Sequence, residues 1–231
     1  MSGVRTVGVV LFGCGTVGKA VLRRLAAAQA HHADKFQLAF KVRAVVDSAG
    51  AVLSEDEVDS DAVLECKEQH QPLSGLPGFV VKEEATGKLQ ALQQEPNIFV
   101  DCTATDGIMG LLQEALTKGA GVVFANKKCL TASMDDFHKF VHPRHMRRCR
   151  FESSVGAGTP FVASTQRVVA AHDTINSIQG TFSGTLGYIT SGLDDGRRLS
   201  QLVQEAYDRG FTEPDPRCQC DSTARQFHLH P

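Results

Sequence analysis

The sequence predicts an α/β fold: a doubly wound parallel sheet followed by a second, smaller α+β unit. Over roughly the first 150 residues, apolar runs of strand length alternate with helical patterns. A glycine-rich turn, GCGTVG at 13–18, joins the first apolar run to the first helical pattern. From Cys149 onward the alternation stops. We therefore expect a domain boundary near residue 150.

The first of the two predicted domains, residues 1–150, begins with VGVVLF at 7–12, a continuous apolar run typical of a buried parallel strand. Residues 15–30 follow with helical spacing of Val17, Ala20, Val21 and Leu25. The polar stretch 54–71 is interpreted as a solvated insertion with one helix. The remaining strands are expected at 42–47, 98–104 and 121–126, and the remaining helices at 88–94, 108–118 and 135–141. Strands separated by helices at this spacing predict a parallel sheet covered on both faces.

The second region, residues 151–217, is expected to start from the strand RFESSV at 150–155. A glycine-rich turn leads to Pro160, which suits a first helical position, and the helix is expected to run to about residue 171. Residues 175–183 alternate as a half-buried strand, and two helices are expected at 186–193 and 199–209. Residues 218–231 form a divergent tail.

Composition excludes several classes of partner. The chain has 231 residues, 42% of them hydrophobic, and a formal net charge of -2, so no broad positive field attracts nucleic acid or an anionic membrane. The basic cluster at 142–150 has no interleaved aromatic residues and is interpreted as a solvated connection. No apolar stretch is long enough to span a bilayer. A small molecule is therefore the expected ligand, with no nucleic-acid or membrane partner.

Cysteine usage and the first residues predict a cytoplasmic location. The seven cysteines are odd in number and scattered, which argues against a disulfide framework. A strand-like run begins at Thr6, which leaves no room for a signal peptide. Cys218 and Cys220, with two later histidines, match no familiar structural zinc spacing and are interpreted as tail residues.

The glycine turn predicts a dinucleotide site, because it lies between a buried strand and an amphipathic helix. Gly13 permits the tight turn, Gly15 lets the backbone approach a pyrophosphate, and Gly18 lets helix and strand pack closely. The phosphates would lie on the helix N-terminus, at Thr16 and Val17, where N–H groups and the helix dipole favour an anion.

Asp47 strengthens the dinucleotide interpretation, because a carboxylate at the end of the second strand can accept hydrogen bonds from ribose hydroxyls. The alternative is turn chemistry, since Ser48 and Gly50 follow. A carboxylate there repels a 2′-phosphate and tilts the cofactor preference toward NAD. Lys41 and Arg43 would act in the opposite direction if either reached the site.

Four further signatures accompany the glycine turn: ANKK at 125–128, ESSVGAGTP at 152–160, GTFSGTLGYI at 180–189 and GFTEPDPR at 210–217. With them the chain resembles homoserine dehydrogenase, an NAD(P)-dependent oxidoreductase of threonine and methionine biosynthesis, over residues 7–217. The resemblance implies interconversion of L-aspartate 4-semialdehyde and L-homoserine, a Rossmann-type domain, a partial catalytic domain and a homodimer. No sign of an aspartate kinase module is present, so the chain resembles the monofunctional type.

The resemblance implies roles for two residues near strand ends. Thr103 matches a cofactor-contacting threonine at the carboxyl edge of the sheet. Lys127 matches a lysine beside the nicotinamide and the substrate, where a cation holds a phosphate or polarises an aldehyde oxygen. The alternative is a surface lysine at a strand end, which is our interpretation of Lys128.

The resemblance also implies a monovalent cation, Na⁺, held largely by backbone carbonyls in the glycine-rich turn. Hard cations prefer oxygen ligands, and the glycines free the backbone to turn its carbonyls inward. The alternative, a helix-initiating loop that binds nothing, stays open. The implied ligands are Glu152, Val155, Ala157 and Thr159.

Substrate recognition is implied at Gly184 and Thr185, which would line the amino-acid pocket, and at Glu213, which would pair with the substrate ammonium. Asp221 echoes the aspartate of the family's proton-transfer pair, whereas Gln226 stands where its lysine is expected. Glutamine is no proton donor at neutral pH. Since family members also continue beyond this point, we expect little activity from the chain as written. The alternative function is a catalytically inert NAD(P)-binding or interaction protein.

Overall fold

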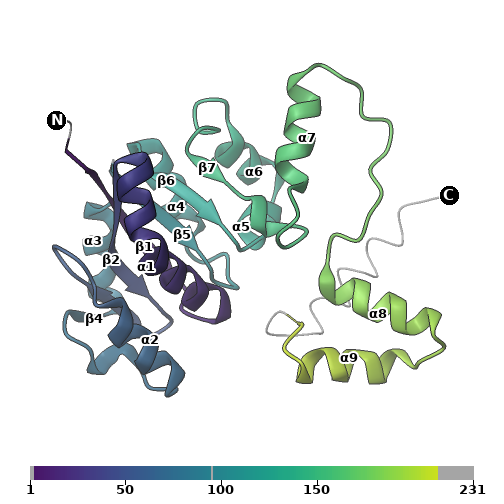
Figure 1. Cartoon of the computed structure of the whole chain (residues 1–231), viewed down its shortest axis with the longest axis horizontal. Helices are drawn as coiled ribbons and strands as arrows, with labels where there is room; N and C mark the ends of the chain where they lie inside the picture. Colours follow the sequence, from purple (N-terminus) through teal and green to yellow (C-terminus); the bar gives the residue numbers. More distant parts are fainter. Residues whose placement is uncertain (1–2, 95, 213–231) are drawn as a thin grey trace. The chain divides into compact units, whose positions relative to one another are not determined.

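The computed structural model describes residues 3–94 and 96–212 of the chain (Figure 1). The chain divides into two compact units, with the division between Phe151 and Glu152.

The first unit is built on a seven-stranded sheet in the order β4-β3-β2-β1-β5-β6-β7. Its parallel strands are β1 (Arg5–Phe12), β2 (Leu38–Val46), β5 (Asn97–Asp101), β6 (Gly121–Phe124) and β7 (Cys149–Arg150). β1 pairs with β2 on one side and with β5 on the other, so the strand order reverses between β1 and β5. The predicted doubly wound α/β fold is confirmed.

Two short antiparallel strands, β3 (Gly50–Leu53) and β4 (Phe79–Val81), extend this sheet beyond β2 and were not predicted. β3 follows β2 after a turn in which the Asp47 N–H donates to the Gly50 carbonyl, 2.9 Å away. These additions make the sheet mostly, rather than wholly, parallel.

Helices cover both faces of the sheet, because strands such as β1 carry apolar side chains on both faces. Leu11 packs with α1 (Thr16–Phe36), α2 (Ser60–Glu68) and the 3₁₀ turn η1 (Leu73–Gly75), which supply Leu22, Val63 and Leu73. Its neighbour Phe12 packs on the opposite face, as alternation along a strand requires. That second face is covered by α3 (Lys82–Ala91), α4 (Met109–Lys118), α5 (Lys128–Thr131) and α6 (Met134–Val141). Figure 1 shows α1, in purple, lying across the strands of this unit.

β2 contains one extra residue relative to β1. Val9 is opposite Val42, but Val10 is opposite Ala44, so Arg43 interrupts the register as a β-bulge. Val42 and Val45 therefore both pack on the α1 face, and Ala44 packs on the other.

The second unit contains η2 (Glu152–Ser154), α7 (Phe161–Ala170), α8 (Gly184–Asp194) and α9 (Leu199–Asp208). α8 and α9 pack closely: a Cβ added to Gly192 would lie 2.3 Å from Leu202 Cδ2. The Tyr188 hydroxyl also donates to Glu205 Oε2, 2.6 Å away.

Two strand predictions for the second region are wrong. Residues 175–183 form no strand, because the described part of this unit offers no second strand with which they could pair. The strand expected at 150–155 ends at Arg150, since the chain turns into η2 at Glu152. Within the described ranges, no helix has the length and apolar character needed to cross a membrane.

Candidate functional site

The glycine turn after β1 packs against the ends of the two neighbouring strands. Gly13 has φ +83, and its N–H donates to the carbonyl of Val46, the last residue of β2, at 2.8 Å. A Cβ on Gly13 would lie 2.7 Å from the Cys102 carbonyl oxygen, just beyond β5. Both the conformation and the space require glycine here.

Gly15 and Gly18 differ in what surrounds them. A Cβ on Gly18 would lie 2.0 Å from the Gly13 carbonyl oxygen, so this glycine lets α1 pack on the turn. A Cβ on Gly15 would meet nothing within 4 Å. Gly15 is also the N-cap of α1, without a side-chain cap, and Thr16 and Val17 follow it exposed. The first turn of α1 thus offers backbone N–H groups to an anion.

The Asp47 carboxylate is engaged on both oxygens. Oδ1 accepts from the N–H groups of Ala49 (2.9 Å) and Gly50 (3.2 Å), and Oδ2 accepts from Lys67 Nζ (2.6 Å). The two side chains of this ion pair are only 14% and 20% exposed. Burial alone would raise the pKa of Asp47, but Lys67 and the two N–H groups outweigh it and hold the pKa below its ordinary value.

The turn chemistry weighed as the alternative for Asp47 is observed, and ribose binding by this residue stays a prediction. Its Oδ1 forms the turn, and Oδ2 lies against a cation that the sequence did not connect with it. Lys67 belongs to α2, inside the stretch that we interpreted as a solvated insertion. The two cations weighed earlier are engaged elsewhere: Lys41 pairs with Asp56, and Arg43 Nε donates to the Ser54 carbonyl at 3.2 Å.

A buried carboxylate, Asp101, lies where β5 ends. Oδ1 accepts from the N–H (2.9 Å) and the hydroxyl (2.8 Å) of Thr103, and Oδ2 accepts from Asn126 Nδ2 (3.1 Å) and the Cys129 thiol (3.7 Å). The residue is 0% exposed. Burial raises the pKa of Asp101 despite these hydrogen bonds. Sequence reasoning missed this residue, although an aspartate that closes the apolar run IFVD was a usable signal.

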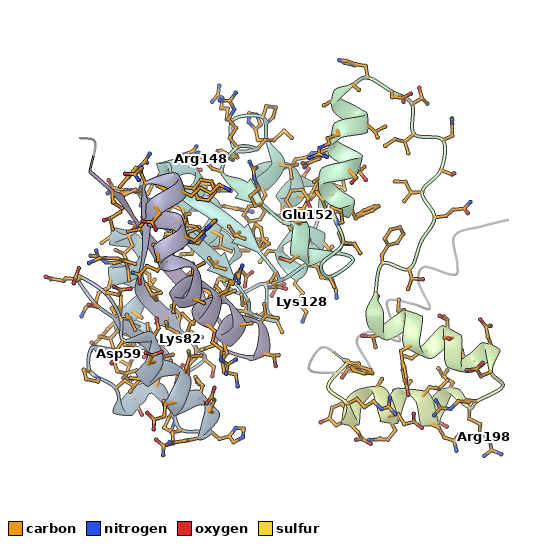
Figure 2. All side chains as sticks on the ribbon, viewed as in Figure 1. Asp59, Lys82, Lys128, Arg148, Glu152 and Arg198 are labelled. Atoms are coloured by element: carbon orange, nitrogen blue, oxygen red, sulfur yellow. The ribbon has the colours of Figure 1, made fainter. Side chains whose placement is uncertain are left out.

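Asn126 connects this carboxylate to the ANKK segment. Its Nδ2 also donates to the Thr105 carbonyl (2.6 Å), and its Oδ1 accepts from the Lys128 N–H (3.0 Å), which starts α5. Lys127 is the N-cap of α5, and both lysines are exposed; Figure 2 labels Lys128. The structure thus brings Thr103 and the base of Lys127 to adjacent strand ends.

The thiols beside this edge are poor nucleophiles. Burial raises the pKa of Cys102 to about 12 and that of Cys129 to about 12. Because the thiolate is the reactive form, burial disfavours nucleophilic chemistry at these two residues at neutral pH.

In the second unit, the Glu152 carboxylate closes the start of α7. Its two oxygens accept from the N–H groups of Val162 (3.0 Å) and Ala163 (2.9 Å); Figure 2 labels Glu152. The Glu152 side chain is therefore held at the start of the helix.

The glycine-rich turn between Glu152 and α7 takes up left-handed backbone conformations. Gly156 has φ +69, and Ala157 has φ +50. The Gly156 carbonyl accepts from the N–H (3.0 Å) and the hydroxyl (2.6 Å) of Thr159, while Val155 is half-buried. Across the described residues, no group of three or more His, Cys, Asp or Glu side chains could hold a metal ion.

The expected substrate residues lie partly within the described chain. Gly184 is the first residue of α8, and Ser183 caps that helix by accepting from the Leu186 N–H at 3.2 Å. Thr185 is buried, and its hydroxyl donates to the Phe211 carbonyl. Glu213 and Asp221, with Gln226, lie outside the described residues.

Two family models match this chain. The model "Homoserine dehydrogenase, NAD binding domain" matches residues 13–152, and the model "Homoserine dehydrogenase" matches residues 160–223. Between them they cover the glycine turn, Asp101, the ANKK segment and the α8–α9 pair.

Named relatives and a solved structure agree with these models. The chain is 30% identical to bifunctional aspartokinase/homoserine dehydrogenase 2 of Zea mays, over 94% of this chain and 23% of that protein. It is 29% identical to homoserine dehydrogenase of Schizosaccharomyces pombe, over 94% and 58% of the two chains. A hyperthermophilic archaeal homoserine dehydrogenase in complex with NADPH is 25% identical with a TM-score of 0.67, over 92% and 64%. The chain thus spans about a quarter of the maize protein, and the bifunctional and singly named relatives are almost equally similar.

Proposed function

This chain belongs to the homoserine dehydrogenase family, and from that premise we propose that it is an NAD(P)-dependent oxidoreductase that interconverts L-aspartate 4-semialdehyde and L-homoserine. The observation that carries the proposal is the open glycine turn on an uncapped helix, at the reversal of strand order. In doubly wound sheets ligands bind at the carboxyl ends of the strands, at this point of reversal.

The cofactor fits this edge of the first unit. Thr16 and Val17 would hold the pyrophosphate through backbone N–H groups, with Gly15 permitting its close approach, Gly13 the tight turn and Gly18 the packing of α1 on that turn. Asp47 would lie near the adenosine ribose. Because Lys67 neutralises that carboxylate, we propose that the site admits both NAD and NADP.

The bound cofactor supplies or accepts a hydride, and this chain's residues handle the charge that develops. When the aldehyde carbon gains hydride, its oxygen becomes an alkoxide, which the Lys127 ammonium would stabilise and a proton would then neutralise. Thr103 would contact the cofactor. By the family resemblance, Gly184, Thr185 and Glu213 would hold the amino acid, and Asp221 would take part in the proton transfer.

The remaining parts of the proposal rest on the same resemblance. A monovalent cation would lie at Glu152, Val155, Ala157 and Thr159, held by backbone oxygens. The boundary between the dinucleotide-binding and substrate domains would fall near residue 150, which the ranges of the two family models support. We also propose a homodimer and, from the unpaired cysteines among the described residues, a reducing cytoplasmic location.

A binding titration and an activity assay together test the function. We expect saturable binding of NADH and NADPH to the folded chain, and an assay of homoserine-dependent reduction of NAD or NADP measures whether the bound cofactor is turned over. A folded preparation that binds neither dinucleotide refutes the proposal. Binding without turnover, at any homoserine concentration, instead favours the inert nucleotide-binding protein.

A further inference from the structure

Asp101 connects the loop that follows β5 with the segment that follows β6, more than twenty residues further along the chain. Its carboxylate accepts from Thr103 and Asn126, and its backbone carbonyl accepts the N–H groups of Ala125 (2.9 Å) and Asn126 (3.2 Å). The next residue, Cys102, donates its N–H to the carbonyl of Phe12 at the end of β1 (2.8 Å). The fully buried Asp101 side chain thus joins the ends of β5 and β6, and the backbone of the adjacent Cys102 joins this edge to the end of β1.

The hydrogen bonds give this carboxylate a directional role. Thr103 places both of its donors on Oδ1, and Asn126 places its amide on Oδ2. Asn126 cannot turn its amide over without losing its bonds to the Thr105 carbonyl and the Lys128 N–H. The loop after β5 and the start of α5 therefore both keep their orientation only if both side-chain oxygens of residue 101 accept hydrogen bonds.

We propose that Asp101 is a positioning residue, which holds the segments 103–105 and 126–128 so that they receive the nicotinamide half of the dinucleotide. This inference rests on the proposed function, because it assumes that a nicotinamide dinucleotide binds at the carboxyl edge of the sheet. It assigns the adenosine half no dependence on Asp101, since that half would be held by the glycine turn and the end of β2.

Asparagine is the sharpest substitution, because it keeps the size of the side chain and removes one acceptor. If the oxygen of the introduced amide faces the two donors of Thr103, its NH₂ group faces the NH₂ group of Asn126, and two donors oppose each other. The Asp101→Asn variant should then displace the 126–128 segment while the glycine turn stays in place.

Two ligands separate positioning from a general loss of structure. NADH occupies both halves of the site, whereas ADP-ribose lacks the nicotinamide. We expect Asp101→Asn to weaken NADH binding by about tenfold or more, equivalent to ~1.4 kcal/mol, and to change ADP-ribose binding by less than about twofold. Both affinities are measured by calorimetric titration of the full chain.

Two further variants keep the test decisive. Asn126→Ala should produce the same selective loss, and it carries the test if Asp101→Asn fails to fold. The double variant should lose less than the product of the two single losses, because both act through one hydrogen bond. The control is Asp136→Asn, which removes a carboxylate that also accepts from Ser133 and Gln113 but lies on α6. This control should leave both affinities unchanged.

The outcomes distinguish the two proposals. Equal weakening of NADH and ADP-ribose, or no weakening of either, overturns the role of Asp101 while the proposed function stands. A wild-type chain that binds ADP-ribose but not NADH overturns the proposed function itself, and this role with it.

Discussion

Adding a side chain at Gly15 should weaken cofactor binding, whereas adding one at Gly18 should lower stability, although the two glycines lie three residues apart in one motif. At Gly15, φ is -82, which any residue adopts, and an added Cβ meets nothing within 4 Å. Gly15→Val should therefore fold, and its unfolding free energy should change by no more than about 1 kcal/mol, the usual effect of an altered helix cap. The valine would instead occupy the space through which a pyrophosphate approaches the helix.

The expected loss of affinity follows from the hydrogen bonds that a displaced phosphate gives up. A hydrogen bond to a charged group contributes about 1.5–3 kcal/mol, so losing a single N–H contact weakens binding by about 10- to 150-fold. Gly15→Val should therefore bind NADH at least about tenfold more weakly. Calorimetric titration measures the affinity, and urea unfolding of the same preparation measures the stability.

Gly18→Ala is the matched comparison. Its Cβ would lie 2.0 Å from the Gly13 carbonyl oxygen, a backbone atom that cannot move without shifting the turn. Overpacking of this kind costs about 1–3 kcal/mol, so this variant should lose stability first. If Gly15→Val binds NADH as the wild type does, or if Gly18→Ala is as stable as the wild type, the assignment of the turn is wrong.

Three other changes test the charges around this edge. Lys67→Met should lower the preference for NADPH over NADH by about tenfold, ~1.4 kcal/mol, because it exposes a 2′-phosphate to an unpaired Asp47 carboxylate; an unchanged ratio of the two dissociation constants would show that the pair lies outside the site. Since the folded pKa of Asp47 lies below its ordinary value of 3.8, its ionised form stabilises the fold above about pH 3.8, and this contribution is lost as the pH falls through the folded pKa. Urea unfolding of wild type and Lys67→Met should therefore differ most at neutral pH and converge in acid, and a constant difference down to about pH 2 would contradict the pairing. Lys127→Met should lower kcat by about 100-fold, and Lys128→Met by less than about threefold. Equal losses of kcat would show that Lys127 has no role beyond that of a surface lysine.

The parts of the fold that could be predicted are those in which local pattern and tertiary environment agree. The run 7–12 is buried on both faces because it becomes a central parallel strand, and the glycine turn that follows has few alternative structures. By contrast, β3 and β4 have only four and three residues, too few for a periodic signal. Residues 175–183 have the alternation of a strand, but pairing depends on a partner that local pattern does not specify.

The residues of the candidate site likewise divide into those that a local pattern identifies and those that depend on tertiary packing. The glycines could be identified from the sequence because the local geometry of the turn requires each of them. Lys67 could not be connected with Asp47, because the contact depends on how α2 packs against the end of β2. Asp101 was passed over because its function is to accept hydrogen bonds from residues up to 28 positions away, a property of the folded sheet.

The extra residue in β2 affects how this protein can be aligned and recombined with its relatives. Side chains alternate along a strand, so the bulge at Arg43 exchanges the faces of every residue between it and the turn. Asp47 meets Lys67 of α2 only after that exchange. A strand without the bulge would match β2 only with a one-residue gap at Arg43, because the pairing resumes with Ala44 opposite Val10. A chimaera that takes β2 from another member should therefore keep the aspartate one residue beyond the partner of Phe12, because the pairing with β1, rather than the residue count from Val42, sets the side of the sheet on which it meets Lys67.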